Sequence, residues 1–311
     1  MPALRIDILT TFPEMFAWDD AARAPGALPA LSCSIPARAR RAGAIAWHAH
    51  NLRDFAQSKH DKTDDRPFGG GPGMVMMCQP VWDAVAAVEA LDPAPATRVY
   101  LTPQGRPLTQ ALVAQLAARP RLLLLAGHYE GVDERVIEAL APIEVSIGDY
   151  VLSGGELAAM VLIDAIARLL PGVLGHDQSA AEDSFALHQT PTLADAHATK
   201  PKRGGTRASA AGEAGTGNRG AQVPLLDCPH YTRPRVWQGR EVPGVLLSGD
   251  HEAVDLWRQT QRIDRTRERR PDLLDLPRPS PTDATPPIAP PPPIPPPPPV
   301  PPAPPPPAKN T

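Results

Sequence analysis

The sequence lacks the features that would place the protein in a membrane or outside the cell. No apolar stretch of the 311 residues approaches the roughly 20 residues that a membrane-spanning helix needs. Residues 1–7 show no basic segment followed by an apolar run, so we expect no signal peptide. Cys33, Cys78 and Cys228 are odd in number and have no paired metal-type spacing, which favours incidental thiols over a disulfide framework. We therefore expect a cytoplasmic protein without a membrane span or a recognisable metal site.

The chain also lacks an excess of charge of one sign. The formal net charge is −3, which argues against general nucleic-acid binding by the whole chain. Positive charge is nevertheless concentrated near the C-terminus, where a local phosphate-binding face is one interpretation and a solvated helix face is another. The arginines concerned are Arg258, Arg262, Arg265, Arg267, Arg269 and Arg270.

Proline, by contrast, is abundant and unevenly placed. Twenty of the 42 prolines lie between Pro277 and Pro307, a composition that cannot form a packed core. A second biased segment, rich in small and charged residues, precedes the arginine-rich region and indicates a flexible linker. The predicted layout is a main domain at 1–185, a linker at 186–224, a small domain at 225–276 and a disordered tail at 277–311.

Strand-like and helix-like patterns alternate through the first 170 residues. Alternation of this kind predicts an α/β domain whose sheet is mostly parallel and covered on both faces. The unbroken apolar run at 122–125 indicates a central strand. The expected strands are 4–10, 44–48, 98–101, 122–126 and 144–146, and the expected helices are 80–91, 108–118 and 155–170.

Glycine-rich segments follow three of these expected strands, at 102–105, 127–131 and 147–155. In open α/β sheets, ligands bind beside the loops that follow the carboxyl ends of strands. Each segment alone could be an ordinary turn, but three after successive strands predict a ligand pocket. A Gly-x-Gly-x-x-Gly match at Gly215, Gly217 and Gly220 is rejected, because it lies inside the expected linker without a strand before it.

Three further segments carry groups suited to binding or proton transfer. Residues 64–74 place two carboxylates and an arginine before a run of glycine and proline, although a structural loop explains that run equally well. Residues 182–185 and 226–234 flank the expected linker and supply carboxylate, imidazole, phenol and guanidinium groups. Such groups could form a site that becomes ordered when a substrate binds.

Taken together, these segments resemble the tRNA (guanine-N1)-methyltransferase family of TrmD type, in the SPOUT class. The resemblance extends over residues 4–274, apart from the linker. The residues that carry it are 12–16, 64–74, 103–105, 129–135, 146–156, 171–175, 182–185 and 226–234.

The resemblance implies a homodimer with a trefoil-knotted, parallel-sheet domain followed by a small helical domain. The implied reaction transfers methyl from S-adenosylmethionine to N1 of guanosine 37 in tRNA, whose anticodon arm the helical domain would bind. Magnesium is associated with the family's activity. The implied cofactor-binding residues are Pro103, Gly105, Gly127, Tyr129, Glu130, Gly131, Ile147, Gly148, Tyr150, Leu152, Gly154 and Gly155.

The resemblance also implies roles in catalysis and substrate binding. Asp183 would be the general base and Arg168 would stabilise developing negative charge on the guanine. The residues implied to seat the target nucleotide are Asp64, Ser179, Asp227, His230 and Tyr231.

The sequence departs from the family pattern in several places. The linker is unusually long, which leaves open how Asp183 and Asp227 come together, and residues 20–41 are expected to enlarge an N-terminal loop. Ala158 replaces a common proline, and His128 replaces a common arginine. Two alternatives stay open: a catalytically inactive tRNA-binding protein of the same fold, and an interaction scaffold centred on the proline-rich tail.

Overall fold

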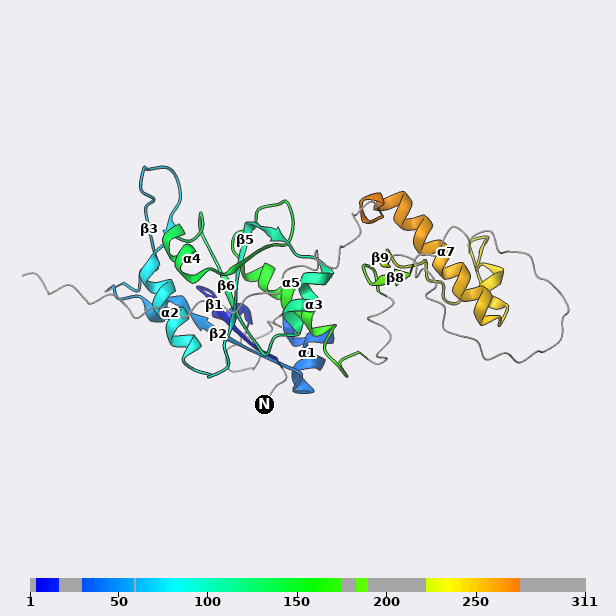
Figure 1. Cartoon of the computed structure of the whole chain (residues 1–311), viewed down its shortest axis with the longest axis horizontal. Helices are drawn as coiled ribbons and strands as arrows, with labels where there is room; N and C mark the ends of the chain where they lie inside the picture. Colours follow the sequence, from blue (N-terminus) through cyan, green and yellow to red (C-terminus); the bar gives the residue numbers. More distant parts are fainter. Residues whose placement is uncertain (1–3, 17–29, 59, 175–182, 190–221, 275–311) are drawn as a thin grey trace, which may run out of the picture. The chain divides into compact units, whose positions relative to one another are not determined.

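The computed structural model describes residues 4–16, 30–58, 60–174, 183–189 and 222–274 (Figure 1). These residues divide into two compact units, the first ending at Ala167 and the second beginning at Arg168. We predicted the domain boundary at residue 185, but the observed division comes earlier, between Ala167 and Arg168. Arg168 and Asp183 therefore both belong to the second unit. The proline-rich tail and the Gly-x-Gly-x-x-Gly match lie outside the described residues.

The first unit is built on a five-stranded sheet in which all neighbouring strands pair in parallel. The strand order is β2-β1-β6-β5-β7, so β6 is central, and all six of its residues are buried. The expected parallel sheet with 122–125 at its centre is confirmed. The strands are β1 (Leu4–Thr10), β2 (Ile45–Asn51), β5 (Thr97–Pro107), β6 (Arg121–Ala126) and β7 (Ile143–Ser146).

Helices cover both faces of this sheet, as Figure 1 shows. On one face α5 (Glu156–Ala167) contacts both α1 (Ser34–Arg41) and α3 (Gln110–Ala117). On the other face α2 (Cys78–Glu89) contacts α4 (Glu134–Leu140). Among the described residues, no helix combines the length and the apolar character that crossing a membrane requires.

Helix α1 corrects the expectation that residues 20–41 only enlarge a loop. Strands β1 and β2 are parallel neighbours, and parallel neighbours need a crossover connection, to which α1 contributes. Its buried side consists only of Pro36, Ala37 and Ala39, while three of its last four residues are arginines. A stripe of such small residues gives a weak apolar signal, so the sequence pattern did not reveal the helix.

Short elements connect the layers of the first unit. A two-stranded antiparallel hairpin interrupts the connection between the second strand and α2. Its strands are β3 (Asp64–Asp65) and β4 (Val75–Met76), and the 3-10 helices are η1 (Pro13–Phe16), η3 (Ala30–Ser32) and η4 (Leu52–Phe55).

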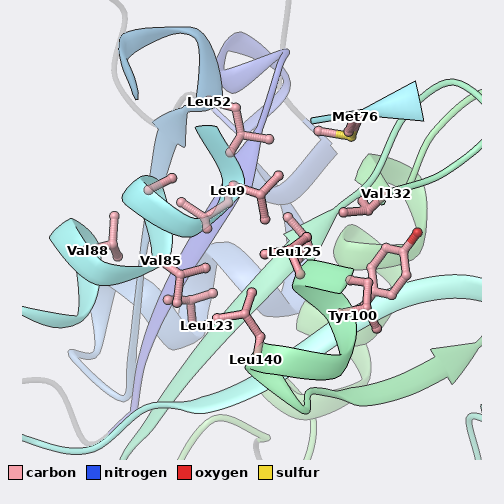
Figure 2. Packing of buried hydrophobic residues seen from close by; sticks show 14 of the residues in the cluster. Leu9, Leu52, Met76, Val85, Val88, Tyr100, Leu123, Leu125, Val132 and Leu140 are labelled. Atoms are coloured by element: carbon pink, nitrogen blue, oxygen red, sulfur yellow. The ribbon is translucent and has the colours of Figure 1, made fainter. Parts of the chain in front are cut away.

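The core between the sheet and the α2–α4 layer follows from the alternation of side chains along β6. Successive side chains of a strand point to opposite faces, and Leu123 and Leu125 belong to this cluster, whereas Leu122 and Leu124 do not. Figure 2 shows Val85 and Val88 of α2 beside Leu123, with Met76, Val132 and Tyr100 at the other end of the cluster. The core therefore reaches the start of the glycine-rich segments.

A buried ionic network joins β1 to β6 and to the end of α2. The Asp7 carboxylate is fully buried and accepts hydrogen bonds at 2.9 Å from Arg5 and from Arg121. His50 Nε2 lies 2.9 Å from Asp7 Oδ1. Burial raises the pKa of Asp7, but the hydrogen bonds from His50, Arg5 and Arg121 outweigh it and hold the pKa below its ordinary value. The carboxylate is thus charged and fully paired.

Arg121 also fixes the C-terminal end of α2. Its guanidinium donates to the carbonyl oxygens of Val88 at 2.6 Å and Glu89 at 3.0 Å, in the last turn of the helix. It donates further to the carbonyls of Asp92 and Ala94 in the segment that follows. The last carbonyls of a helix have no partner within the helix, so a cation at this place satisfies them.

The second unit contains two antiparallel hairpins and one long helix. Strands β8 (Leu187–Gln189) and β9 (Gln222–Pro224) pair with each other, as do β10 (Val236–Trp237) and β11 (Arg240–Glu241). Helix α7 (His251–Arg269) begins after Asp250, whose carboxylate accepts from the Ala253 N–H at 3.1 Å. Two 3-10 helices flank it, η6 (Gly244–Leu247) and η7 (Pro271–Leu273).

The pairing of β8 with β9 corrects the prediction of a flexible linker at residues 186–224. Both strands lie inside residues 186–224, so the two ends of that segment are paired strands and not flexible coil. The prediction failed there because antiparallel pairing joins residues more than 30 positions apart, which local composition cannot reveal. Residues 190–221 lie outside the described part of the chain.

Removal of the Asp7 charge should destabilise the fold strongly. Asp7→Asn leaves the buried Arg121 guanidinium without its carboxylate, and we expect a loss of about 3–5 kcal/mol in the free energy of unfolding at neutral pH, measured with urea. The depressed pKa of Asp7 means that its stabilisation is present above the ordinary aspartate pKa of about 4 and is lost below it. The difference between the two proteins should therefore shrink as the pH falls.

Asp92→Asn is the matched control, because Asp92 contacts Arg5 at the partly exposed rim of the same network. It should cost about 1 kcal/mol or less. Equal losses for Asp7→Asn and Asp92→Asn would contradict the role given to the buried carboxylate.

Candidate functional site

A cavity of about 360 Å³ lies in the first unit, where β6 and β7 end and β5 leaves the sheet. The three glycine-rich segments form its walls together with the start of α5. Eleven of the twelve residues predicted to bind the cofactor line it, all except Gly105. The complete lining is Tyr100–Gln104, Gly127–Val132, Glu134, Glu144–Gly148, Tyr150–Gly155 and Ala158.

The first wall results from a bulge in β5. Both Leu101 and Arg106 pair with Val145, so residues 102–105 leave the ladder and bring Pro103 and Gln104 to the cavity. Gly105 closes the bulge against β7, where a Cβ atom would collide with the backbone of Val145. Gly105 therefore shapes the wall without lining the cavity.

The second wall is the loop after β6. Tyr129 and Gly131 have positive φ values of 61° and 132°, which turn the chain sharply beside the cavity. Gly127 lies over the ring of Tyr100, with only 3.0 Å between the ring and an added Cβ atom. Burial raises the pKa of the Tyr100 phenol, so this group stays neutral at the cavity wall.

The glycine run at 64–74 supports this second wall. Backbone hydrogen bonds connect Met74 O to Glu130 N at 3.0 Å and Gly131 O to Met76 N at 2.9 Å. Gly73 has a φ of 85°, and any side chain there would collide with Glu130. The segment that could have been only a structural loop thus holds a predicted cofactor-binding loop in place.

The third wall runs from the end of β7 to the start of α5. Gly148 has a φ of 150°, and Gly155 N–H donates to Gly127 O at 2.7 Å, which joins the second and third walls. Gly154 forms a bridge with His128, and a Cβ atom on Gly154 would collide with the His128 ring and the Glu156 carboxylate. Two glycines in succession let these backbones approach one another.

Glu156, His128 and Thr10 form a polar group behind the third wall that our predictions missed. Glu156 is 3% exposed and accepts from the Thr10 hydroxyl at 2.7 Å. His128 Nδ1 lies 3.5 Å from the second Glu156 oxygen, and within the described residues this nitrogen makes no hydrogen bond. Acidic residues are common at helix starts, so the sequence carried no sign that this glutamate is buried.

The predicted catalytic residues are paired in the second unit. Arg168 Nη2 donates to Asp183 Oδ2 at 2.8 Å, and the two side chains are equally exposed, at 42%. An exposed ion pair contributes little to stability, so both groups are available for a ligand at small energetic cost. The structure thus brings together the residues to which the family resemblance gave catalytic roles.

Asp183 and Asp227 are neighbours in the same unit despite the long segment between them. Asp227 N–H donates at 3.0 Å to the hydroxyl of Ser184, the residue after Asp183, and Phe185 N–H donates to Leu225 O at 2.7 Å. These bonds continue the β8–β9 pairing toward the site. Since the two ends of the segment are joined in this way, its length does not keep residues 183–185 away from residues 225–227.

Asp227 is the centre of a polar cluster that contains His230, a second predicted substrate-binding residue. His230 Nε2 lies 2.8 Å from Asp227 Oδ2, and Arg262 of α7 lies 3.5 Å from Oδ1. Burial raises the pKa of Asp227, but His230, a backbone N–H and Arg262 together have the larger, opposite effect. The pKa is therefore lowered overall, and the carboxylate is charged. The ring of Tyr231 lies 6.2 Å from that of Trp257.

The other two predicted substrate-binding residues are not in this cluster. Asp64 lies in the β3–β4 hairpin of the first unit, and Ser179 lies outside the described residues. Their predicted roles therefore gain no support from the contacts of the second unit.

Asp227, Cys228 and His230 bring three possible metal ligands within 4.8 Å of one another, although we expected no metal site. Asp227 already pairs with His230, and the Arg262 cation is nearby. Burial and the charge of Asp227 raise the pKa of the Cys228 thiol, whereas metals bind the thiolate. We assign no metal to this group.

The fold and the cavity define an α/β protein with a ligand pocket at the carboxyl edge of a parallel sheet. A model of the tRNA (guanine-1)-methyltransferase family TrmD matches residues 4–210 and 205–276, and the chain belongs to that family. The resemblance deduced from the sequence is thereby confirmed.

Several curated relatives support this assignment. The chain is 49% identical over 270 residues to a tRNA (guanine-N(1)-)-methyltransferase of Halorhodospira halophila, covering 87% of this chain and 84% of that protein. Identity to the proteins of the same name is 44% over 272 residues in Stenotrophomonas maltophilia and 46% over 275 residues in Pseudomonas entomophila. The alignments cover 88% of this chain and 90% and 91% of those two proteins.

A side chain at position 154 should weaken ligand binding in the cavity, because it would collide with two neighbouring side chains. Gly154→Ala forces His128 and Glu156 apart, and we expect at least a 10-fold rise in the dissociation constant for S-adenosylmethionine, measured by calorimetry. Gly244→Ala is the matched control, because Gly244 has open space around it and lies in the second unit. Unchanged affinity in Gly154→Ala would show that the cavity is not the cofactor site.

Proposed function

We propose that this protein transfers a methyl group from S-adenosylmethionine to N1 of guanosine 37 in tRNA. Relatives at 43–49% identity carry the name tRNA (guanine-N(1)-)-methyltransferase. The observation that carries the proposal is the meeting of three glycine-rich segments around one cavity at the sheet edge. Parallel α/β sheets bind their ligands at this edge.

The cavity fits S-adenosylmethionine in size and in chemistry. Its volume of about 360 Å³ is within the range of small-molecule sites. Because Gly127, Gly131 and Gly148 carry no side chain, an adenine or a ribose can approach the backbone closely at these walls. When bound, S-adenosylmethionine supplies an activated sulfonium methyl group, so alignment is the main task left to the protein.

Asp183 and Arg168 are proposed to activate the guanine. Guanine N1 carries a proton at neutral pH and is a poor nucleophile until that proton leaves. In our proposal the Asp183 carboxylate would accept the proton of guanine N1, and Arg168 would stabilise the negative charge that develops on O6 when that proton leaves. The 2.8 Å bond between them orients the carboxylate before the substrate arrives.

The substrate nucleotide is proposed to bind beside this pair. Asp227 and His230 supply hydrogen-bonding groups from the cluster next to Ser184, and Tyr231 supplies a ring for stacking. Asp64 and Ser179 complete the set by family resemblance. The anticodon arm would bind the second unit, and a homodimer would join units of different subunits at one site.

Three further parts of the proposal rest on the family alone. These are the trefoil knot in the first unit, the contribution of magnesium to activity, and the choice of position 37. A catalytically inactive RNA-binding protein of the same fold is the alternative. The presence of Asp183 and Arg168 as an exposed pair favours the enzyme.

The decisive assay uses labelled S-adenosylmethionine and tRNA transcripts that differ only in the nucleotide at position 37. We expect methyl transfer to the transcript with guanosine at this position and none to the transcript with adenosine. Binding of the cofactor is measured in parallel by calorimetry. If the cofactor binds and neither transcript is methylated, the enzymatic proposal is wrong and the RNA-binding alternative stands.

Replacing the proposed base should separate chemistry from binding. Asp183→Asn keeps the size of the side chain but cannot accept the N1 proton, so we expect single-turnover transfer to slow by roughly 10²–10⁴-fold. The dissociation constants for cofactor and tRNA should change less than threefold. Asp164→Asn, an exposed position on α5, is the matched control. Wild-type rates in Asp183→Asn would assign the base to another residue.

A further inference from the structure

A small hairpin in the second unit presents a tryptophan to solvent. Strands β10 and β11 pair Val236 with Glu241 and Trp237 with Arg240. Gln238 and Gly239 form the turn and both have positive φ values, 49° and 77°, as in the tight turns that suit two-residue hairpins. We call residues 236–241 the Trp237 hairpin.

The two faces of the Trp237 hairpin differ in chemistry. Directly paired residues of antiparallel strands project to the same face, so Trp237 and Arg240 share one face and Val236 and Glu241 share the other. The first face combines a large aromatic ring with a guanidinium group. The second combines a small apolar group with a carboxylate.

The Trp237 face is open in the described part of the chain. Trp237 is 56% exposed, and its indole makes no hydrogen bond or ring contact with another described residue. Arg240 and the nearby Arg233 and Arg235 are exposed and form no ion pair within the described residues. Exposed indole surface is unfavourable in water, and here the charges beside it are unpaired cations.

This combination matches the chemistry of an RNA loop. Unpaired bases stack on aromatic rings, while arginines bind the phosphates that connect them. A nonspecific apolar partner would leave Arg233, Arg235 and Arg240 without counter-charges. A polyanion with aromatic bases satisfies both parts of the surface at once.

We propose that the Trp237 hairpin is an RNA-binding element, in which Trp237 stacks on an unpaired base in the anticodon arm of the tRNA substrate and Arg240 binds an adjacent phosphate. The inference rests on the proposed function and adds a contact surface to it. The hairpin contains none of the residues assigned to cofactor binding or catalysis. Its removal should therefore affect RNA binding and leave cofactor binding intact.

The test measures binding of a guanosine-37 tRNA transcript by four variants. Trp237→Ala should raise the dissociation constant roughly 5- to 100-fold, the range for loss of one stacked base, and Trp237→Phe should recover most of the affinity. Arg240→Gln should weaken binding and reduce the slope of log affinity against log salt concentration by about 1. Val236→Ala, on the other face, is the matched control and should bind like the wild type.

A second RNA probe separates stacking from general attraction. In a transcript whose anticodon arm is replaced by a fully paired stem of equal length, no unpaired base is present in that arm. Trp237→Ala should then bind as the wild type does, while Arg240→Gln should still bind more weakly. Calorimetry with S-adenosylmethionine should give the same affinity for all variants, which shows that the site in the first unit is intact.

Several results would overturn the inference. One is unchanged tRNA affinity in Trp237→Ala, and another is an equal loss of tRNA affinity in Val236→Ala and Trp237→Ala. A third is a change in the sedimentation coefficient of Trp237→Ala, which would identify the hairpin as a contact between copies of the chain. Failure of the proposed function looks different, since the wild type itself would then transfer no methyl group. If the wild type methylates tRNA and Trp237→Ala binds tRNA with unchanged affinity, only the RNA-binding role of the hairpin is rejected.

Discussion

The parallel pairing of β5 with β6 on one side and β7 on the other is the constraint on which the site depends. Parallel neighbours end at the same edge of a sheet, so the segments that follow β6 and β7 meet there. The bulge at residues 102–105 brings β5 to the same edge in the middle of the strand. Without that interruption β5 would continue along β7, and the cavity would lack one wall.

Glycine is required at this edge because backbones there lie closer together than side chains permit. Gly105 packs on the backbone of Val145, and Gly155 packs on Ala126 and Gly127. The three walls thereby support one another, and the β3–β4 hairpin supports the second through Met74 and Met76. The cavity is a product of this mutual packing and not of any single segment.

Much of the first unit could be predicted from the sequence because its elements have strong local patterns. The bounds of β1 match the expected 4–10, and β6 exceeds the expected 122–126 by only Arg121. The length of β5 could not be predicted, since residues 102–107 resemble a loop and rejoin the sheet only through pairing with β7. Helix α1 could not be predicted, because its buried side chains are small and give a weak apolar pattern.

In the candidate site too, features with a local sequence signal could be predicted and features that depend on distant contacts could not. The loops around the cavity were recognisable because glycine after a strand is a local signal, and eleven of the twelve residues predicted to bind a cofactor line this cavity. The support of Glu130 by the 64–76 segment and the burial of Glu156 depend on contacts between distant residues. The Ser184–Asp227 bond likewise spans 43 positions, which no local pattern can report.

The hydrogen bonds of the Arg121 guanidinium make one part of the first unit more rigid than the rest. The guanidinium ties the last turn of α2 to β1 and β6 through Val88, Glu89 and Asp7. Amide hydrogens in these elements should exchange with solvent only through global unfolding, whereas those of residues 127–131 and 147–155 should exchange through local opening. Ligand entry can then deform the edge of the sheet while its base keeps the geometry of the folded state.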